Sequence, residues 1–214
     1  MTHGLADFFY RLVISAPIFL LAIVLHELAH GWVAYRLGDD TAKRAGRLTL
    51  SPIAHLDLVG TIVFVLTSRF GFGFGWAKPV PVMIERLRNP RRDEILVTLA
   101  GPLTNLLQAT VWAVLLRLAL RMTSGLGPAL AAFCVLGLSI NLLLFIFNLL
   151  PIPPLDGFHV ALRLLGFDDP HLAGRLAGLG FVVLFLFITT GAFGWVLGAV
   201  FMPLRQLFLP PGFF

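Results

Sequence analysis

Long apolar runs dominate this chain, and short polar segments separate them. Three runs, Phe8 to Leu37, Ile95 to Leu120 and Ala129 to Leu150, reach the ~20 residues that a helix needs to cross a hydrocarbon core. Leu155 to Gly166 predicts a short helix, and Leu172 to Phe208 predicts C-terminal helices that span the bilayer or lie at its interface. We therefore expect an all-α membrane protein, a polytopic bundle of about five to six transmembrane helices.

The run from Ser51 to Val82 is also apolar, but proline and glycine interrupt it. The interruptions are Pro52, Gly60, Gly71, Gly73, Gly75, Pro79 and Pro81. Such a segment makes a poor straight helix, so we expect a short helix around Val59 to Thr67 followed by an extended, glycine-rich return. Irregular backbone at membrane depth must pack against protein or line a cavity. We interpret residues 51–82 as a re-entrant hairpin and a candidate substrate-contacting element.

Composition supports a bilayer protein, since 58% of the 214 residues are hydrophobic and 13% are charged. One membrane-embedded domain over residues 1–214 is expected, without a soluble appendage. The formal net charge of +5 arises from Lys and Arg in loops beside apolar runs, which indicates lipid headgroups rather than nucleic acid as the partner. The run Leu12 to Leu25 lacks a clear small-residue cleavage site, so we interpret it as a retained helix and not as a secretory signal.

Basic loops predict the orientation of the chain. Lys43 to Arg47 and Arg86 to Arg92 are the most basic loops, and such loops lie preferentially on the cytoplasmic side. The hairpin between them must then enter and leave on that side. If each long helix then crosses the membrane in turn, Glu27, Ala100 to Asn105 and Asp156 come to a similar depth near the cytoplasmic face. The expected location is a multi-pass position in a bacterial or archaeal inner membrane.

His26, Glu27 and His30 stand in an otherwise apolar helix and form the pattern H-E-x-x-H. Residues four apart share one face of a helix, so the two imidazoles can bind one Zn²⁺. A glutamate beside the first ligand can take a proton from a water activated by the metal. Each ionisable side chain costs roughly 3 kcal/mol in the centre of a membrane helix unless it is paired or functional. The pattern therefore predicts a zinc site rather than chance.

A catalytic zinc site has a third protein ligand and an open position. Between Ile95 and Phe167 the single acidic residue is Asp156, which follows a proline-broken helix end. It is the preferred candidate, although an aspartate before a helical run can also be an N-cap. The alternatives are the nearby His159, which could be a ligand or a supporting donor, together with His55 and Asp57 near the start of the hairpin.

These motifs resemble the site-2 proteases, the M50 family of intramembrane zinc metalloproteases. The resemblance rests on His-Glu-Leu-Ala-His at 26–30, on Ala-Gly-Pro-Leu-Thr-Asn at 100–105, and on Asn-Leu-Leu-Pro-Ile-Pro-Pro-Leu-Asp-Gly at 148–157. Residues 75–81 resemble the hairpin of the compact bacterial members. Many members carry a PDZ or CBS domain, for which this chain has no room, so substrate selection is expected from the bundle, the hairpin or a regulatory membrane partner.

The resemblance implies roles for individual residues. His26, His30 and Asp156 would bind one zinc ion, and Glu27 would be the catalytic base. Asn148 is expected to contact the substrate or an oxyanion, and Asn105 to line the cleft or support it.

The implied activity is hydrolysis of peptide bonds in transmembrane segments of substrate proteins during regulated intramembrane proteolysis. The segment would unwind near the cytoplasmic face and pair with the hairpin, in which Gly73 and Gly75 would contact it as an added strand. A membrane di-iron oxygenase needs more clustered histidines than the six present. The remaining alternative is a metal transporter or a catalytically inactive metal-binding membrane protein, and the presence of Glu27 argues against both.

Overall fold

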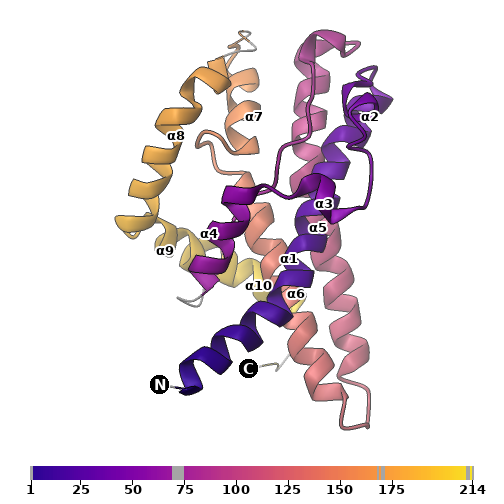
Figure 1. The fold of residues 1–214 in the computed structure, drawn as a ribbon, viewed down its shortest axis with the longest axis vertical. Coiled ribbons are helices and arrows are strands. Elements are labelled where there is room, and N and C mark those ends of the chain that lie inside the picture. Colours follow the sequence, from indigo (N-terminus) through magenta and orange to yellow (C-terminus); the bar gives the residue numbers. More distant parts are fainter. Residues whose placement is uncertain (1, 69–74, 168, 170–171, 211–212, 214) are drawn as a thin grey trace.

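The computed structural model describes residues 2–68, 75–167, 169, 172–210 and 213. Three long helices form its centre: α1 (Thr2–Arg36), α5 (Pro90–Ala119) and α6 (Gly127–Asn148). Figure 1 shows α5 and α6 as an antiparallel hairpin with α1 crossing it, and α1 packs against both. Among the described residues, these three helices are the ones that are individually long and apolar enough to cross a membrane. The all-α class is thus confirmed.

The start of α5 lies earlier than the hydrophobic pattern predicted. Pro90 occupies the first turn, where its missing N–H costs nothing. The backbone N–H of Asn89 donates to Asp93 Oδ2 at 2.9 Å, and the N–H of Asp93 donates to the Asn89 carbonyl at 2.8 Å. These bonds satisfy backbone groups at the helix start. The basic segment before Ile95 therefore becomes the first helical turn.

The hairpin segment folds back on itself. It contains α3 (Pro52–His55) and α4 (Leu58–Ser68), and the 11 residues of α4 cover about 16 Å, roughly half of a hydrocarbon core. Leu56 forms an antiparallel bridge with Ala77, and the N–H of Lys78 donates to the His55 carbonyl at 2.8 Å. The two ends of the segment therefore lie together, as a hairpin that enters and leaves on one side requires.

The C-terminal part adds one short helix and a bent apolar arm. The elements are α7 (Asp156–Leu164), α8 (Leu172–Thr189), α9 (Ala192–Val196), a π-helical turn η2 (Leu197–Phe201) and α10 (Met202–Phe208). The arm bends by 70° near Gly191, whose φ of 84° favours glycine. If the arm counts as one span, the described chain has up to four candidate spans. This is fewer than the five to six expected, because α4 is short and the C-terminal run forms one bent arm.

Small side chains let the central helices approach closely. Ala109 and Ala113 of α5 are buried against Cys134, Leu138 and Leu142 of α6. Close backbone approach through small residues is the usual way that membrane helices associate, because burial in lipid offers no hydrophobic gain. Two short elements, α2 (Thr41–Arg44) and the 3-10 turn η1 (Ile84–Arg86), lie in the connection between α1 and α5. The long helices α1, α5 and α6 pack together as one framework that holds the polar face of α1.

Candidate metal centre

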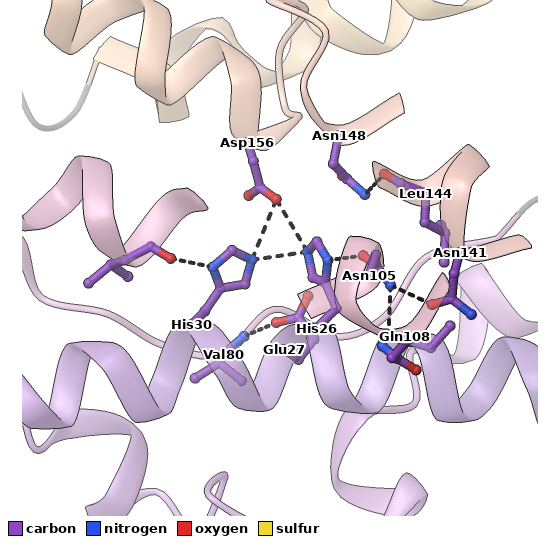
Figure 2. A network of polar contacts seen from close by, with 12 residues as sticks. His26, Glu27, His30, Val80, Asn105, Gln108, Asn141, Leu144, Asn148 and Asp156 are labelled. Atoms are coloured by element: carbon purple, nitrogen blue, oxygen red, sulfur yellow. Dashed lines mark hydrogen bonds and ion pairs between the residues drawn. The ribbon is translucent and has the colours of Figure 1, made fainter. Parts of the chain in front are cut away.

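His26, His30 and Asp156 converge although 126 residues separate the second from the third. The two histidines lie one turn apart on α1, and Asp156 is the first residue of α7. Their Nε2 atoms are 3.0 Å apart, and Asp156 Oδ2 lies 3.2 Å from His26 Nε2 and 3.5 Å from His30 Nε2. Figure 2 shows the carboxylate above the two imidazoles. The three groups could hold a metal ion.

The hydrogen bonds behind the histidines fit a metal-binding role. His26 Nδ1 lies 2.6 Å from Asn105 Oδ1, and His30 Nδ1 lies 2.7 Å from the Val97 carbonyl. Both partners accept, so each Nδ1 carries a proton and a neutral ring turns the lone pair of Nε2 towards the other ring. The buried Asp156 Oδ2 has no hydrogen-bond donor. Three electron-pair donors that face one another repel unless a cation joins them, and a two-histidine, one-carboxylate set suits zinc.

Burial completes the donor set. The side chains of His26, His30 and Asp156 are 10%, 12% and 21% exposed to solvent. The group is therefore shielded, but water and small solutes can still reach it. Gly101 of α5 packs directly on the rings: a Cβ at this position would lie 2.3 Å from His30 Nε2 and 2.6 Å from His26 Nε2. A side chain at Gly101 would therefore occupy the space of the metal group.

Glu27 lies next to this group and is held by the return of the hairpin. We call residues 76–83 the strap. The N–H of Val80 donates to Glu27 Oε2 at 2.8 Å, and Val80 stands between Pro79 and Pro81, neither of which has a backbone N–H to offer. In Figure 2 the Glu27 carboxylate lies below the imidazoles, and Asp156 lies above them. The strap thus fixes the orientation of Glu27.

Two buried ionised side chains hold the ends of the strap. Arg47 Nη2 donates to the Lys78 carbonyl at 2.5 Å. At the other end, Asp39, which has 0% exposure, accepts from the Met83 N–H at 2.7 Å through Oδ2. Charge-assisted bonds of this kind are stronger than neutral ones. The position of Val80 against Glu27 therefore depends on both contacts.

A buried ion pair ties α7, the helix that carries Asp156, to α5. Arg163 Nε donates to Glu94 Oε2, and these residues are 6% and 7% exposed. Gly157 lies against the backbone of Leu149, where a Cβ would meet the carbonyl oxygen at 2.2 Å. The Gly157 contact fixes the first turn of α7 and the ion pair fixes its last turn, so the helix is held at both ends and Asp156 points towards the histidines.

The other ligand candidates are engaged elsewhere. His159 Nδ1 lies 3.7 Å from Glu94 Oε1, and His55 Nε2 lies 2.9 Å from the Thr49 carbonyl. Asp57 Oδ1 accepts from the Gly60 N–H at 2.8 Å, at the start of α4. Asp156 itself makes no capping bond, and the N-cap of α7 is Leu155. The geometry therefore favours Asp156 as a metal ligand over Asp156 as a helix cap.

The proposed substrate contacts lie in different surroundings. Asn148 is half-buried at the end of α6, and its Nδ2 donates to the Leu144 carbonyl at 3.0 Å. Asn105 has 0% exposure and lies behind His26. Gly75 packs against α4, because a Cβ there would lie 2.6 Å from the Gly60 carbonyl oxygen. Gly73 lies outside the described residues. Substrate contact by these residues stays a prediction.

Most of the groups that hold the site, among them the side chains of Arg47, Asp39, Glu94 and Arg163 described above, were absent from the sequence-based prediction. The Val80 N–H and the Val97 carbonyl are backbone groups, for which sequence carries no signal. The steric role of Gly101 depends on a contact between distant helices. Asn141 did leave a signal, since a polar side chain in the middle of an apolar membrane helix is usually functional or paired.

The fold and the site define a class: a polytopic helical membrane protein with a buried His–His–Asp group beside a glutamate. Three relatives refine it. The chain is 42% identical to "Putative zinc metalloprotease YwhC" of Bacillus subtilis, over 79% of this chain and 78% of that protein. It is 32% identical to "Putative zinc metalloprotease Rip2" of Mycobacterium tuberculosis, over 85% and 69%. It is 34% identical to "Putative zinc metalloprotease MJ0611" of Methanocaldococcus jannaschii, over 63% and 61%.

The chain therefore belongs to the site-2 protease family of zinc metalloproteases. No family model matches it. No solved structure matches it either. The family resemblance seen in the sequence motifs is thus confirmed by the relatives.

Proposed function

We propose that this protein is an intramembrane zinc metalloprotease that hydrolyses peptide bonds in transmembrane segments of other proteins. The observation that carries the proposal is the placement of Glu27, on the apolar helix α1, beside three electron-pair donors that converge from α1 and α7. A protein that only binds or transports a metal has no need of a carboxylate held beside the ligands but outside the ligand group. The names of the relatives support the zinc-dependent protease part of this proposal.

His26, His30 and Asp156 would hold the zinc ion, which when bound supplies Lewis acidity that activates a water and polarises a carbonyl. Glu27 then acts as general base: its carboxylate takes a proton from the attacking water and later gives it to the leaving nitrogen. The N–H of Val80 holds one carboxylate oxygen in place. The apolar helices around the site limit the access of bulk water, which strengthens the electrostatic interactions inside.

The charge distribution supports a site that faces the cytoplasm. Exposed Lys and Arg gather where α1 ends and α5 begins, at Arg36, Lys43, Arg44, Arg86, Arg88, Arg91 and Arg92. His30 lies six residues before the end of α1, or about 9 Å along the helix axis. By the positive-inside rule this end is cytoplasmic. We infer that the substrate is cut near the cytoplasmic face and that a separate membrane protein regulates access.

The experiment compares wild-type protein with Glu27→Gln and His26→Ala, each purified in detergent. Bound zinc is measured, and cleavage is tested on a panel of single-span membrane proteins. Glu27→Gln should retain zinc and lose cleavage, because amide replaces base without changing the ligands, whereas His26→Ala should lose both. Equal cleavage by wild type and Glu27→Gln would refute the role of Glu27. Zinc flux into vesicles without cleavage would favour the transporter instead.

A further inference from the structure

Behind His26 of α1, a chain of hydrogen bonds runs through two buried asparagines, first on α5 and then on α6 (Figure 2). Asn105 of α5 accepts from His26 Nδ1, and Asn105 Nδ2 donates to Asn141 Oδ1 of α6 at 3.2 Å. Both asparagines have 0% exposure. Both lie on the Nδ1 side of His26, opposite the Nε2 atom that faces the metal group.

The contacts determine which way the Asn105 amide points. Its Nδ2 faces two acceptors, Asn141 Oδ1 and the Ala22 carbonyl, the latter at 3.3 Å. A flipped amide would place oxygen against both acceptors and leave its N–H₂ group facing His26. Asn141 is oriented in turn, because its Nδ2 donates to the Gly137 carbonyl at 3.0 Å. The direction of every bond in the chain thus follows from a backbone carbonyl at its far end.

Of the two histidines, only His26 depends on this chain of side chains for its tautomer. His30 is oriented by a backbone carbonyl, that of Val97, which is present whatever the side chains are. His26 depends on a side chain, which can present either an acceptor or a donor. An acceptor at Nδ1 selects the Nδ1–H tautomer and leaves Nε2 free to bind a metal. A donor there would select the opposite tautomer and direct a proton at the metal group.

We propose that Asn105 and Asn141 are positioning residues for His26: Asn105 holds the imidazole in its metal-binding tautomer, and Asn141 holds Asn105 in the orientation that does so. This inference rests on the proposed zinc site and assigns to Asn105 a role other than substrate contact. Loss of such a supporting partner typically lowers metal affinity by about 10–100-fold. A residue that merely fills space would show no such dependence on its acceptor oxygen.

The test measures Co²⁺ affinity by chelator competition in the purified detergent-solubilised protein and records the visible absorption spectrum of the bound ion. Asn105→Leu should bind Co²⁺ about 10–100-fold more weakly with an altered spectrum. Asn105→Asp keeps an acceptor for His26 Nδ1 but turns its second oxygen towards the Ala22 carbonyl and Asn141 Oδ1, so it should bind more weakly than wild type but more tightly than Asn105→Leu. The matched control is Gln108→Leu. Gln108 is also buried and also donates to the Ala22 carbonyl, at 3.4 Å, but its hydrogen bond goes to neither histidine nor to Asn105.

Asn141 provides a second, independent pair of variants, which decides the question if Asn105→Leu does not fold. Asn141→Leu removes the acceptor for Asn105 and should weaken Co²⁺ binding by about 10-fold, whereas Asn141→Asp keeps it and should bind more tightly than Asn141→Leu. When Asn105→Leu folds, adding Asn141→Leu should cause no further loss, because both act through one path.

Two results would overturn the proposal: unchanged Co²⁺ affinity in both leucine variants, or an equal loss in Gln108→Leu. Neither depends on proteolysis. If the wild-type protein binds metal but cleaves no substrate, the proposed protease activity fails while the positioning role is still decided by the affinities.

Discussion

Gly101→Ala adds one methyl group to the face of α5 that lies on the two imidazoles. The new Cβ would stand 2.3 Å from His30 Nε2 and 2.6 Å from His26 Nε2. Favourable non-bonded contact begins at about 3.5 Å, so the methyl group falls short by about 1 Å. Neither ring can simply retreat, because Asn105 and Val97 hold the opposite nitrogens. Movement of α5 would instead break the bond between Asn105 and His26.

A displacement of about 1 Å in a catalytic group commonly costs about 100-fold in rate. We therefore expect Gly101→Ala to lose at least that factor in substrate cleavage and to bind zinc more weakly. The ordinary effect of the substitution has the opposite sign, since Ala is favoured over Gly inside a helix by about 1 kcal/mol. Loss of metal without loss of fold is thus a specific signature of the clash.

The assay combines zinc affinity, cleavage of a single-span substrate and thermal unfolding of the metal-free protein. Gly178→Ala in α8 is the matched control, because beyond the backbone of its own helix no heavy atom of the described residues lies within 4 Å of the added Cβ. It should leave zinc affinity and cleavage unchanged. Wild-type zinc affinity in Gly101→Ala would show that the rings and α5 do not pack as described, and the reasoning from this contact would be refuted.

Three further outcomes follow from the contacts around the site. Arg163→Met removes the guanidinium that pairs with the buried Glu94 carboxylate and leaves it, among the described residues, only the longer contact with His159, at 3.7 Å. This should lower the free energy of unfolding by about 3–5 kcal/mol in thermal or denaturant unfolding; an unchanged value would contradict the importance of this pair. Asp39→Asn replaces a buried acceptor of the strap and should cost about 1–3 kcal/mol in the same measurement, with slower cleavage because Val80 no longer holds Glu27 firmly; unaltered stability and rate would argue against that coupling. Zinc at 100 times its dissociation constant should stabilise the wild-type protein by about 2.7 kcal/mol; His26→Ala should lose this dependence, and a retained shift would place the metal elsewhere.

Local sequence was sufficient for the first part of the site. His26, Glu27 and His30 lie within five residues of one helix, and helical geometry alone puts the two imidazoles on one face. Asp156 could be reached by elimination because charged residues are scarce in an apolar chain. The long helices were also predictable, since a hydrocarbon core demands unbroken apolar runs. Their number was not, because a short helix such as α4 and a bent arm such as α8–α10 have the same composition as a span.

What only the tertiary structure decided is how the site is held. The orientation of His26 depends on Asn105 and Asn141, 79 and 115 residues away in sequence. That of Glu27 depends on a backbone N–H, and the room for the metal group depends on Gly101. Sequence specifies the donors because donor chemistry belongs to individual side chains. Their tautomers, directions and spacing are properties of contacts between helices, and these exist only once α1, α5, α6 and α7 have packed together.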